Sequence, residues 1–283
     1  MNSLEFYKMS GSGNDFIIID NRQKIVSENN LSAFIKKICQ RKLSVGADGF
    51  ILVENSDKCD FKWQFYNSDG SRAEMCGNGA RCAARFAEIT GICTSKLSFE
   101  TDVGIVYANI SDDRVKIKMT DPEDMNIDYS LNLKKGPLTV SSINTGVPHV
   151  VIIVDNINKI DLLTLGKEIR YHKHFAPAGT NVNLIFQKKD KSIVIRTYER
   201  GVEGETLACG TGSVAGAIIF SYKNKIPSPI GITTKSGEIL NIYFTEKIGR
   251  YTDIYLEGDA RLVYKGKLYK DAWNFTMPNN MTI

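Results

Sequence analysis

Two short stretches decide the fold: MCGNGARCAARF, residues 75–86, and LACGTGSVAGAI, residues 207–218. In each stretch a cysteine precedes a Gly-x-Gly turn, and the Ala-rich sequence behind the turn favours a helix. We therefore expect Cys76 and Cys209 at helix N-termini, where unpaired backbone N–H groups and the helix dipole favour a thiolate or a substrate carboxylate. Both following segments carry few charges, which indicates helices buried in the middle of a domain.

The cysteine motifs belong to a longer internal repeat. Four segments recur in the same order at nearly constant offsets: Asn14 with His149 at 135, Gly46 with Gly179 at 133, Tyr66 with Tyr198 at 132, and Cys76 with Cys209 at 133. Such a match indicates a duplicated domain. Two units related by a pseudo-twofold axis would bring the equivalent cysteines to opposite walls of one interdomain cleft.

Composition limits the class of partner. The chain has 283 residues, 42% of them hydrophobic, and Lys and Arg exceed Asp and Glu by only four. The basic residues are dispersed, so we expect neither nucleic acid nor a membrane as partner, but a small molecule. The amino terminus has no signal-peptide pattern, and no apolar run reaches transmembrane length. These features predict a cytoplasmic protein.

The six cysteines do not suggest a disulfide framework, which is typical of small secreted chains. Zinc ligands usually come in close pairs, but the nearest cysteines are six residues apart and there are only three histidines, so we expect no metal. We interpret four thiols as buried small hydrophobes: Cys39, Cys59, Cys82 and Cys93.

Two thiols facing each other across a bound carbon suit a two-base inversion, in which a thiolate removes a proton from one face and a thiol returns one to the other. This chemistry needs no cofactor. GSGNDF, starting at Gly11, begins like a dinucleotide fingerprint but lacks its third glycine. No motif argues against pyridoxal phosphate, but paired cysteines make a lysine Schiff base unnecessary.

The ordered motifs MSGSGNDFIIID, GADGFILVE, FYNSDGSRAEMCGNGARC, GVPHVV, GTNVNLI and TYERGVEGETLACGTG resemble those of the diaminopimelate epimerase family. They lie between Met9 and Gly216. The resemblance implies pyridoxal-independent conversion of LL- to meso-diaminopimelate in lysine and peptidoglycan-precursor synthesis, by a homodimer. Proline racemases and phenazine-biosynthesis-type isomerases share the wider fold but lack the full set of motifs.

The resemblance also implies roles for individual residues. Cys76 and Cys209 would be the acid/base pair, and His149 and Glu199 would tune these two thiols respectively. The backbone N–H groups of four residues would hold the reacting carboxylate: Gly77, Asn78, Gly210 and Thr211. Side-chain contacts to substrate would come from Asn14, Asn67, Asn181, Glu199 and Arg200. Other interpretations are a structural histidine, a surface ion pair for Arg200, and turn or cap roles for the asparagines.

Two positions depart from the family's pattern. Val147 stands in GVPH where many members have Asn, and Gly49 in GADGF stands where some members have a larger polar residue. Neither is a cysteine of the pair, so the departures bear on substrate affinity more than on the reaction.

The expected fold class is α+β, with two pseudo-symmetric domains, each a curved, mostly antiparallel sheet wrapped around a central helix. The predicted domains are residues 1–121, which 266–283 would complete by family resemblance, and 122–265. DPEDMNIDYS, residues 121–130, is the expected crossover. LSAFIKKICQRK, residues 31–42, is a further helix candidate.

Three alternative functions remain open at this point. A redox-sensing dithiol protein would cycle Cys76 and Cys209 through a disulfide. An inactive binding module with this fold would bind a ligand without proton exchange. A proline or hydroxyproline racemase is disfavoured because Asn67, Asn181 and Arg200 suit a second amino-acid end.

Overall fold

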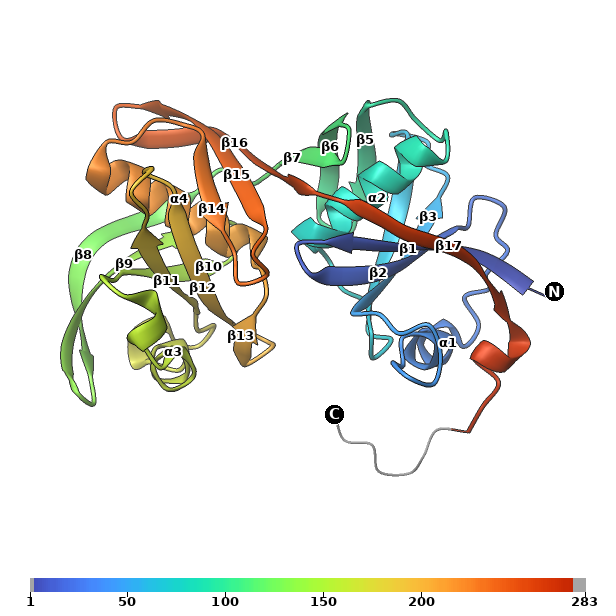
Figure 1. Ribbon diagram of the computed structural model, residues 1–283, viewed down its shortest axis with the longest axis horizontal. Coiled ribbons are helices and arrows are strands. Elements are labelled where there is room, and N and C mark those ends of the chain that lie inside the picture. The colour runs from blue at the N-terminus through green and yellow to red at the C-terminus, as the bar shows by residue number, and fades with distance from the viewer. Residues whose placement is uncertain (1–2, 277–283) are drawn as a thin grey trace. The chain divides into compact units, whose positions relative to one another are not determined.

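The computed structural model describes residues 3–276. The chain divides into two compact units, one of Met1–Val115 with Ala260–Ile283 and one of Lys116–Asp259. Each unit combines a mostly antiparallel sheet with a long central helix (Figure 1), which confirms the predicted α+β class. Residues 277–283, assigned to the first domain from the sequence, lie outside the described part. No helix within residues 3–276 is both long and apolar enough to cross a membrane.

The first unit is built from both ends of the chain. Its elements are β1 (Ser3–Gly11), β2 (Asn14–Asp20), α1 (Leu31–Ile38), β3 (Gly49–Glu54), β4 (Phe61–Asn67), α2 (Gly77–Ile89), β5 (Lys96–Thr101), β6 (Gly104–Ser111) and β17 (Arg261–Tyr269). The short helix η3 (Lys270–Ala272) follows, and β7 (Arg114–Lys118) contains the boundary. The last strand, β17, pairs antiparallel with β1, and Figure 1 shows the two side by side.

The second unit is continuous in sequence. It contains β8 (Glu123–Leu133), β9 (Gly136–Asn144), β10 (Pro148–Ile153), η1 (Ile157–Lys159), α3 (Leu162–Arg170), η2 (Lys173–Phe175), β11 (Asn181–Gln187), β12 (Ile193–Glu199), β13 (Gly204–Thr206), α4 (Gly210–Asn224), β14 (Ile230–Thr233), β15 (Ile239–Lys247) and β16 (Arg250–Asp259). DPEDMNIDYS is not the crossover, because most of it lies in β8, which pairs antiparallel with β9.

The strand registers repeat between the units. In the first unit β2 and β3 are parallel and β3 and β4 antiparallel, and in the second β10, β11 and β12 follow the same order. Phe50 lies opposite Tyr66, and Val182 lies opposite Tyr198. Each residue of the second pair lies 132 positions after its counterpart in the first pair (182 − 50 and 198 − 66). The sheets therefore carry the duplication that the sequence predicts.

The registers also refine one equivalence. Phe16 lies opposite Gly49, and His149 lies opposite Asn181. Because Gly49 and Asn181 correspond at the offset of 132 (181 − 49), Phe16 is the structural equivalent of His149. The sequence match aligned Asn14 with His149 instead, and is wrong by two residues here.

Helices cover both faces of the central strands. In the first unit, Ile17, Phe50 and Leu52 pack in one cluster with Ile35 of α1. Alternate strand residues point to the opposite face, where Phe16 and Ile51 lie against Gly79 of α2. Burial on both faces explains the continuous apolar runs of these strands.

The second unit repeats this arrangement. Val182 and Leu184 pack with Ile169 of α3, whereas Ile185 and Ile195 lie against Gly216 of α4. The central helices α2 and α4 are thus buried against their own sheets, as the low charge of their sequences predicts.

Candidate active site

Cys76 is the N-cap of α2. Its backbone is extended, with φ −146° and ψ 115°, and its Sγ accepts a hydrogen bond of 3.5 Å from the Gly79 N–H. The first helical bond runs from the Ala80 N–H to the Cys76 carbonyl, at 2.8 Å. Helix geometry leaves the N–H groups of Gly77 and Asn78 without intrahelical acceptors, so this end of α2 can bind an anion beside the sulfur.

Cys209 has the equivalent place on α4. It is extended, with φ −121° and ψ 114°, and its carbonyl accepts from the Ser213 N–H at 2.9 Å. Its buried Sγ lies 3.5 Å from Thr211 Oγ1. The N–H groups of Gly210 and Thr211 precede the first helical bond, so they too can bind an anion.

Gly212 lets the first turn of α4 approach strand β11 closely. A Cβ at this position would lie 2.4 Å from Asn183 Oδ1 and 3.3 Å from Cys209 Sγ. The first distance is shorter than real Cβ contacts. Glycine is therefore needed here for the close approach of the helix to Asn183.

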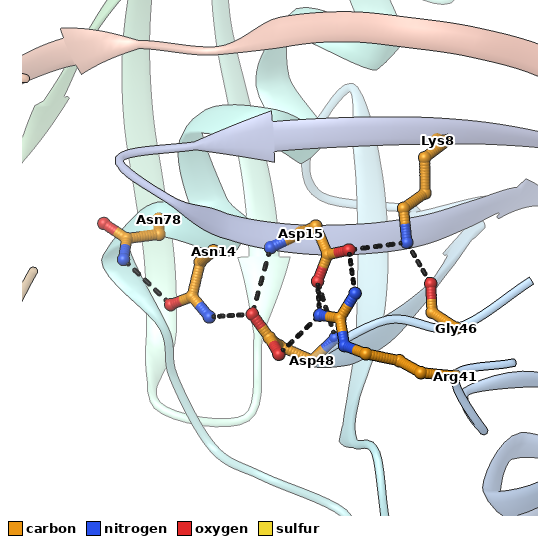
Figure 2. Close-up of polar contacts among 7 residues, drawn as sticks. All are labelled: Lys8, Asn14, Asp15, Arg41, Gly46, Asp48 and Asn78. Atoms are coloured by element: carbon orange, nitrogen blue, oxygen red, sulfur yellow. Dashed lines mark hydrogen bonds and ion pairs between the residues drawn. The ribbon is translucent and has the colours of Figure 1, made fainter. Parts of the chain in front are cut away.

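Asn14 and Asn78 contact each other across the first unit. Asn78 Nδ2 donates to Asn14 Oδ1 at 3.0 Å, and Asn14 Nδ2 donates to Asp48 Oδ2 at 2.9 Å, as Figure 2 shows. On the other side, Arg81 donates to Asn78 Oδ1 at 3.1 Å. Two predicted substrate contacts thus belong to one hydrogen-bonded chain.

Asn67 ends β4 opposite Gly49. Its side chain is exposed and donates to Ser71 Oγ at 3.0 Å.

A Cβ on Gly49 would lie 2.8 Å from the Phe65 ring and 3.0 Å from the Phe16 ring. These two aromatic side chains occupy the space that a larger residue would need, which accounts for the glycine.

His149 is buried in the second unit. Its Nδ1 lies 3.1 Å from Asn183 Nδ2, which also donates to the Val150 carbonyl at 2.9 Å. Thr197 Oγ1 donates to Asn183 Oδ1 at 2.9 Å, which fixes the orientation of that amide. His149 Nδ1 is therefore an acceptor, and the proton of the neutral ring is on Nε2.

The surroundings keep His149 uncharged. Burial, together with a smaller effect of the positive charge of Arg200, lowers the pKa of His149 to about 3. Nε2 has no hydrogen-bond partner within residues 3–276. A buried donor without a partner is costly, so Nε2–H is available for a bound ligand.

Glu199, Arg200 and Asn181 lie together at one end of β11 and β12. Burial raises the pKa of Glu199. Asn181 Oδ1 accepts from the Arg200 N–H at 2.8 Å, and its Nδ2 donates to the Pro148 carbonyl at 3.1 Å. Asn181 therefore holds the backbone that carries Arg200.

The Arg200 guanidinium donates to the Ala178 carbonyl at 3.2 Å. Within residues 3–276 no carboxylate forms an ion pair with it, so the surface ion pair considered from the sequence is absent there. The planar donor group can bind a carboxylate ligand.

The other cysteines lie in different surroundings. Burial raises the pKa of Cys39 to about 12 and that of Cys93 to about 11, which disfavours their thiolates. Cys39 and Cys82 are buried as expected. Cys59 and Cys93 are only partly buried, so the prediction of four buried thiols is wrong for these two.

The sequence interpretation missed three polar residues around the site: Asp48, Arg81 and Asn183. Arg81 and Asn183 are completely buried. A signal for Asn183 was present, because it lies two residues from Asn181 on the same face of a strand whose remaining residues are apolar up to Gln187.

The chain matches known proteins along most of its length. The family model for diaminopimelate epimerase matches residues 6–125 and 141–263. The diaminopimelate epimerase of Aquifex aeolicus is 42% identical over 283 residues, covering 96% of this chain and 100% of that protein. The diaminopimelate epimerase of a Hydrogenobaculum species is 45% identical over 273 residues, covering 92% and 97%.

Solved structures share the fold at low identity. A Bacillus anthracis phenazine biosynthesis protein of the PhzF family is 16% identical, with a TM-score of 0.71 and coverage of 95% of this chain and 99% of that one. A probable proline racemase from Agrobacterium radiobacter is 14% identical, with a TM-score of 0.68 and coverage of 97% and 96%.

Proposed function

Because the chain belongs to the diaminopimelate epimerase family, we propose that it converts LL-2,6-diaminopimelate to the meso isomer without a cofactor. This isomerase would act in lysine and peptidoglycan-precursor biosynthesis. The observation that carries the proposal is that Cys76 and Cys209 cap the central helices of two units with repeated strand registers.

The proposed reaction uses the two sulfurs as base and acid. One cysteine, as thiolate, takes the proton from the α-carbon of one amino-acid end. The other cysteine, as thiol, gives its proton to the opposite face of the same carbon. The thiol and thiolate have then exchanged roles, and the enzyme is ready for the reverse direction.

The backbone N–H groups at both helix ends would hold the carboxylate at the reacting carbon: Gly77, Asn78, Gly210 and Thr211. A positioned acid or base accelerates a reaction by about 10²- to 10⁴-fold. That is too little for a poorly acidic α-proton, so the preoriented dipoles must stabilise the carbanion as well.

Neighbouring groups would tune the thiols. His149, neutral with its proton on Nε2, would stabilise a thiolate by donating a hydrogen bond, and its low basicity argues against proton uptake. Glu199, with its pKa raised by burial, is a stronger base than an exposed carboxylate and suits a partner for Cys209.

Several side chains would recognise the rest of the substrate. The Arg200 guanidinium would bind the distal carboxylate, with its backbone held by Asn181. Asn14, Asn67 and Glu199 complete the proposed contacts. The proposal includes a homodimer, which the family resemblance implies, and a cytoplasmic location. Size-exclusion chromatography with light scattering measures the oligomeric state.

The test is incubation of the reduced protein with LL-diaminopimelate in D2O, with α-deuterium uptake and meso product measured together. L-Proline is the parallel substrate. Exchange with inversion on diaminopimelate alone supports the proposal. Exchange on proline alone would show that proline, and not diaminopimelate, is a substrate. No exchange on either compound would contradict an epimerase or racemase function.

A further inference from the structure

A chain of side-chain hydrogen bonds crosses the first unit from α2 to the loop before β3. Its order is Arg81 to Asn78, Asn78 to Asn14, and Asn14 to Asp48, with distances of 3.1, 3.0 and 2.9 Å. Figure 2 shows the part from Asn78 to Asp48. In each bond the earlier residue donates and the later one accepts.

The two ends of the chain determine this direction. A guanidinium can only donate and an ionised carboxylate can only accept, whereas an Asn amide can turn either way. Arg81 therefore fixes the oxygen of Asn78 toward itself, and Asp48 fixes the nitrogen of Asn14 toward itself. If either amide turned over, two donors or two acceptors would meet.

Both ends are held in place. Arg81 also donates to Ser12 Oγ at 2.8 Å and to the Gly77 carbonyl at 3.3 Å. Asp48 Oδ1 accepts from Arg41 at 2.9 Å, and Asp48 Oδ2 accepts from the Asp15 N–H at 3.3 Å.

A second carboxylate supports Asp48. Asp15 accepts from Arg41 at 2.6 and 3.0 Å and pairs with Lys8 at 2.8 Å. Lys8 also donates to the Gly46 carbonyl. Burial opposes ionisation of Asp15, but the hydrogen bonds from Arg41 and Lys8 outweigh it and lower the pKa of Asp15 to about 2. Asp15, at the centre of the cluster in Figure 2, is therefore ionised at neutral pH.

We propose that Asp48 and Arg81 are positioning residues that set the amide orientation of Asn14 and Asn78 for substrate binding. The inference rests on the proposed function, because it takes Asn14 as a substrate contact. After its bonds to Asn78 and Asp48, Asn14 keeps one N–H and one oxygen lone pair in fixed places. An amino acid presents both an acceptor carboxylate and a donor ammonium, so an inverted amide would face it with the wrong groups.

The first experiment measures the orientation without any reaction. In the full-length protein, the side-chain NH2 signals of Asn14 and Asn78 are followed by ¹⁵N NMR in the wild type and in Asp48→Ala. Asp48 is exposed, so this variant loses little packing. We expect shifted signals and faster hydrogen exchange for Asn14, while Asn55, which donates to the Arg22 carbonyl, stays unchanged.

The second experiment measures the consequence for catalysis. We expect Asp48→Ala to raise KM about tenfold with kcat within about twofold, the pattern for a lost binding contact. Asp48→Asn, which retains one acceptor oxygen, should have a smaller effect. Asp20→Ala is the matched control. Asp20 also accepts a hydrogen bond from an arginine, Arg22, but it takes no part in the series of hydrogen bonds from Arg81 to Asp48.

A double-mutant cycle separates positioning from a general structural role. In an Asn14→Ala background, Asp48→Ala should change kcat/KM no further, because the amide that it orients is gone. The inference would be overturned if the two substitutions lowered kcat/KM independently, so that their factors multiplied in the double variant. It would also be overturned if the NMR signals of Asn14 stayed unchanged in Asp48→Ala. A wild type without deuterium exchange on diaminopimelate would instead overturn the proposed function, while the NMR result still decides the orientation.

Discussion

The amide of Asn183 donates a hydrogen bond to Nδ1 of His149 across 3.1 Å. Because Thr197 and the Val150 carbonyl orient that amide, His149 is held as a neutral ring. Protonating Nδ1 would place two donors against each other. A charged His149 is thus excluded both by the solvation lost on burial and by its hydrogen-bond partner.

This arrangement predicts a pH-dependent stability. The pKa of His149 is about 3 in the folded protein, below the value of about 6.5 of an unfolded histidine. The unfolded state therefore binds the extra proton first, and stability is complete above about pH 6.5 and falls as the pH drops toward about 3. When the pH falls from 7 to 5.5, the free energy of unfolding should decrease in both proteins. The decrease should be about 1 kcal/mol smaller in His149→Gln than in the wild type.

Urea unfolding at the two pH values measures this difference. His172 and His174 are present in both proteins, so their contributions cancel. An equal loss in wild type and variant would show that His149 titrates normally.

The two-base proposal predicts the effect of removing either sulfur. Cys76→Ala and Cys209→Ala should each reduce epimerisation at least about 10²-fold, the lower limit for a positioned acid or base. The folds should persist, since each change removes one atom at a helix N-cap. Kinetics and circular dichroism measure both properties, with Cys59→Ala as a control of unchanged activity. Near-normal turnover of either variant would end the two-base assignment.

Arg200→Lys should mainly weaken substrate capture. An ammonium cannot reproduce the paired N–H groups of a guanidinium, so we expect KM to rise about tenfold with a smaller change in kcat. Steady-state kinetics with LL-diaminopimelate measures the two constants. If both stay at their wild-type values, Arg200 does not contact the substrate.

Gly212→Ala tests the close approach of α4 to β11. The added methyl group would meet Asn183 Oδ1 at 2.4 Å, so the first turn of the helix must shift. We expect about a 10²-fold loss of kcat, because displacements of about 1 Å at a reacting group have effects of this size. Gly216→Ala is the matched control within the same helix, where the nearest atom lies at 3.2 Å. Equal activity of both variants would contradict the argument.

Local patterns were enough to predict much of this protein. Short segments of sequence indicate the helices that begin after Cys76 and Cys209, the apolar strands and the matches that make up the repeat. The structure contains all of these features. Strand β8 was missed because its residues are at least partly exposed at most positions, so it has neither an apolar run nor a buried face.

Contacts between distant segments could not be predicted in this way. Asp48 meets Asn14 across 34 positions, and Asn183 meets His149 across 34. Each residue alone resembles a turn or strand polar group. Their joint role comes from parallel strand pairs, β2 with β3 and β10 with β11, which place the starts of two strands together.

The pairing of β17 with β1 has a consequence for biosynthesis. On the ribosome, the segment Lys116–Asp259 emerges whole and can fold as soon as it has left the exit tunnel. The strand β1 emerges before it, yet must wait for β17, which is made about 260 residues later, to complete its sheet. The half that carries Cys209 therefore needs no segment made after Asp259, whereas the half that carries Cys76 depends on both the earliest and the latest described strands.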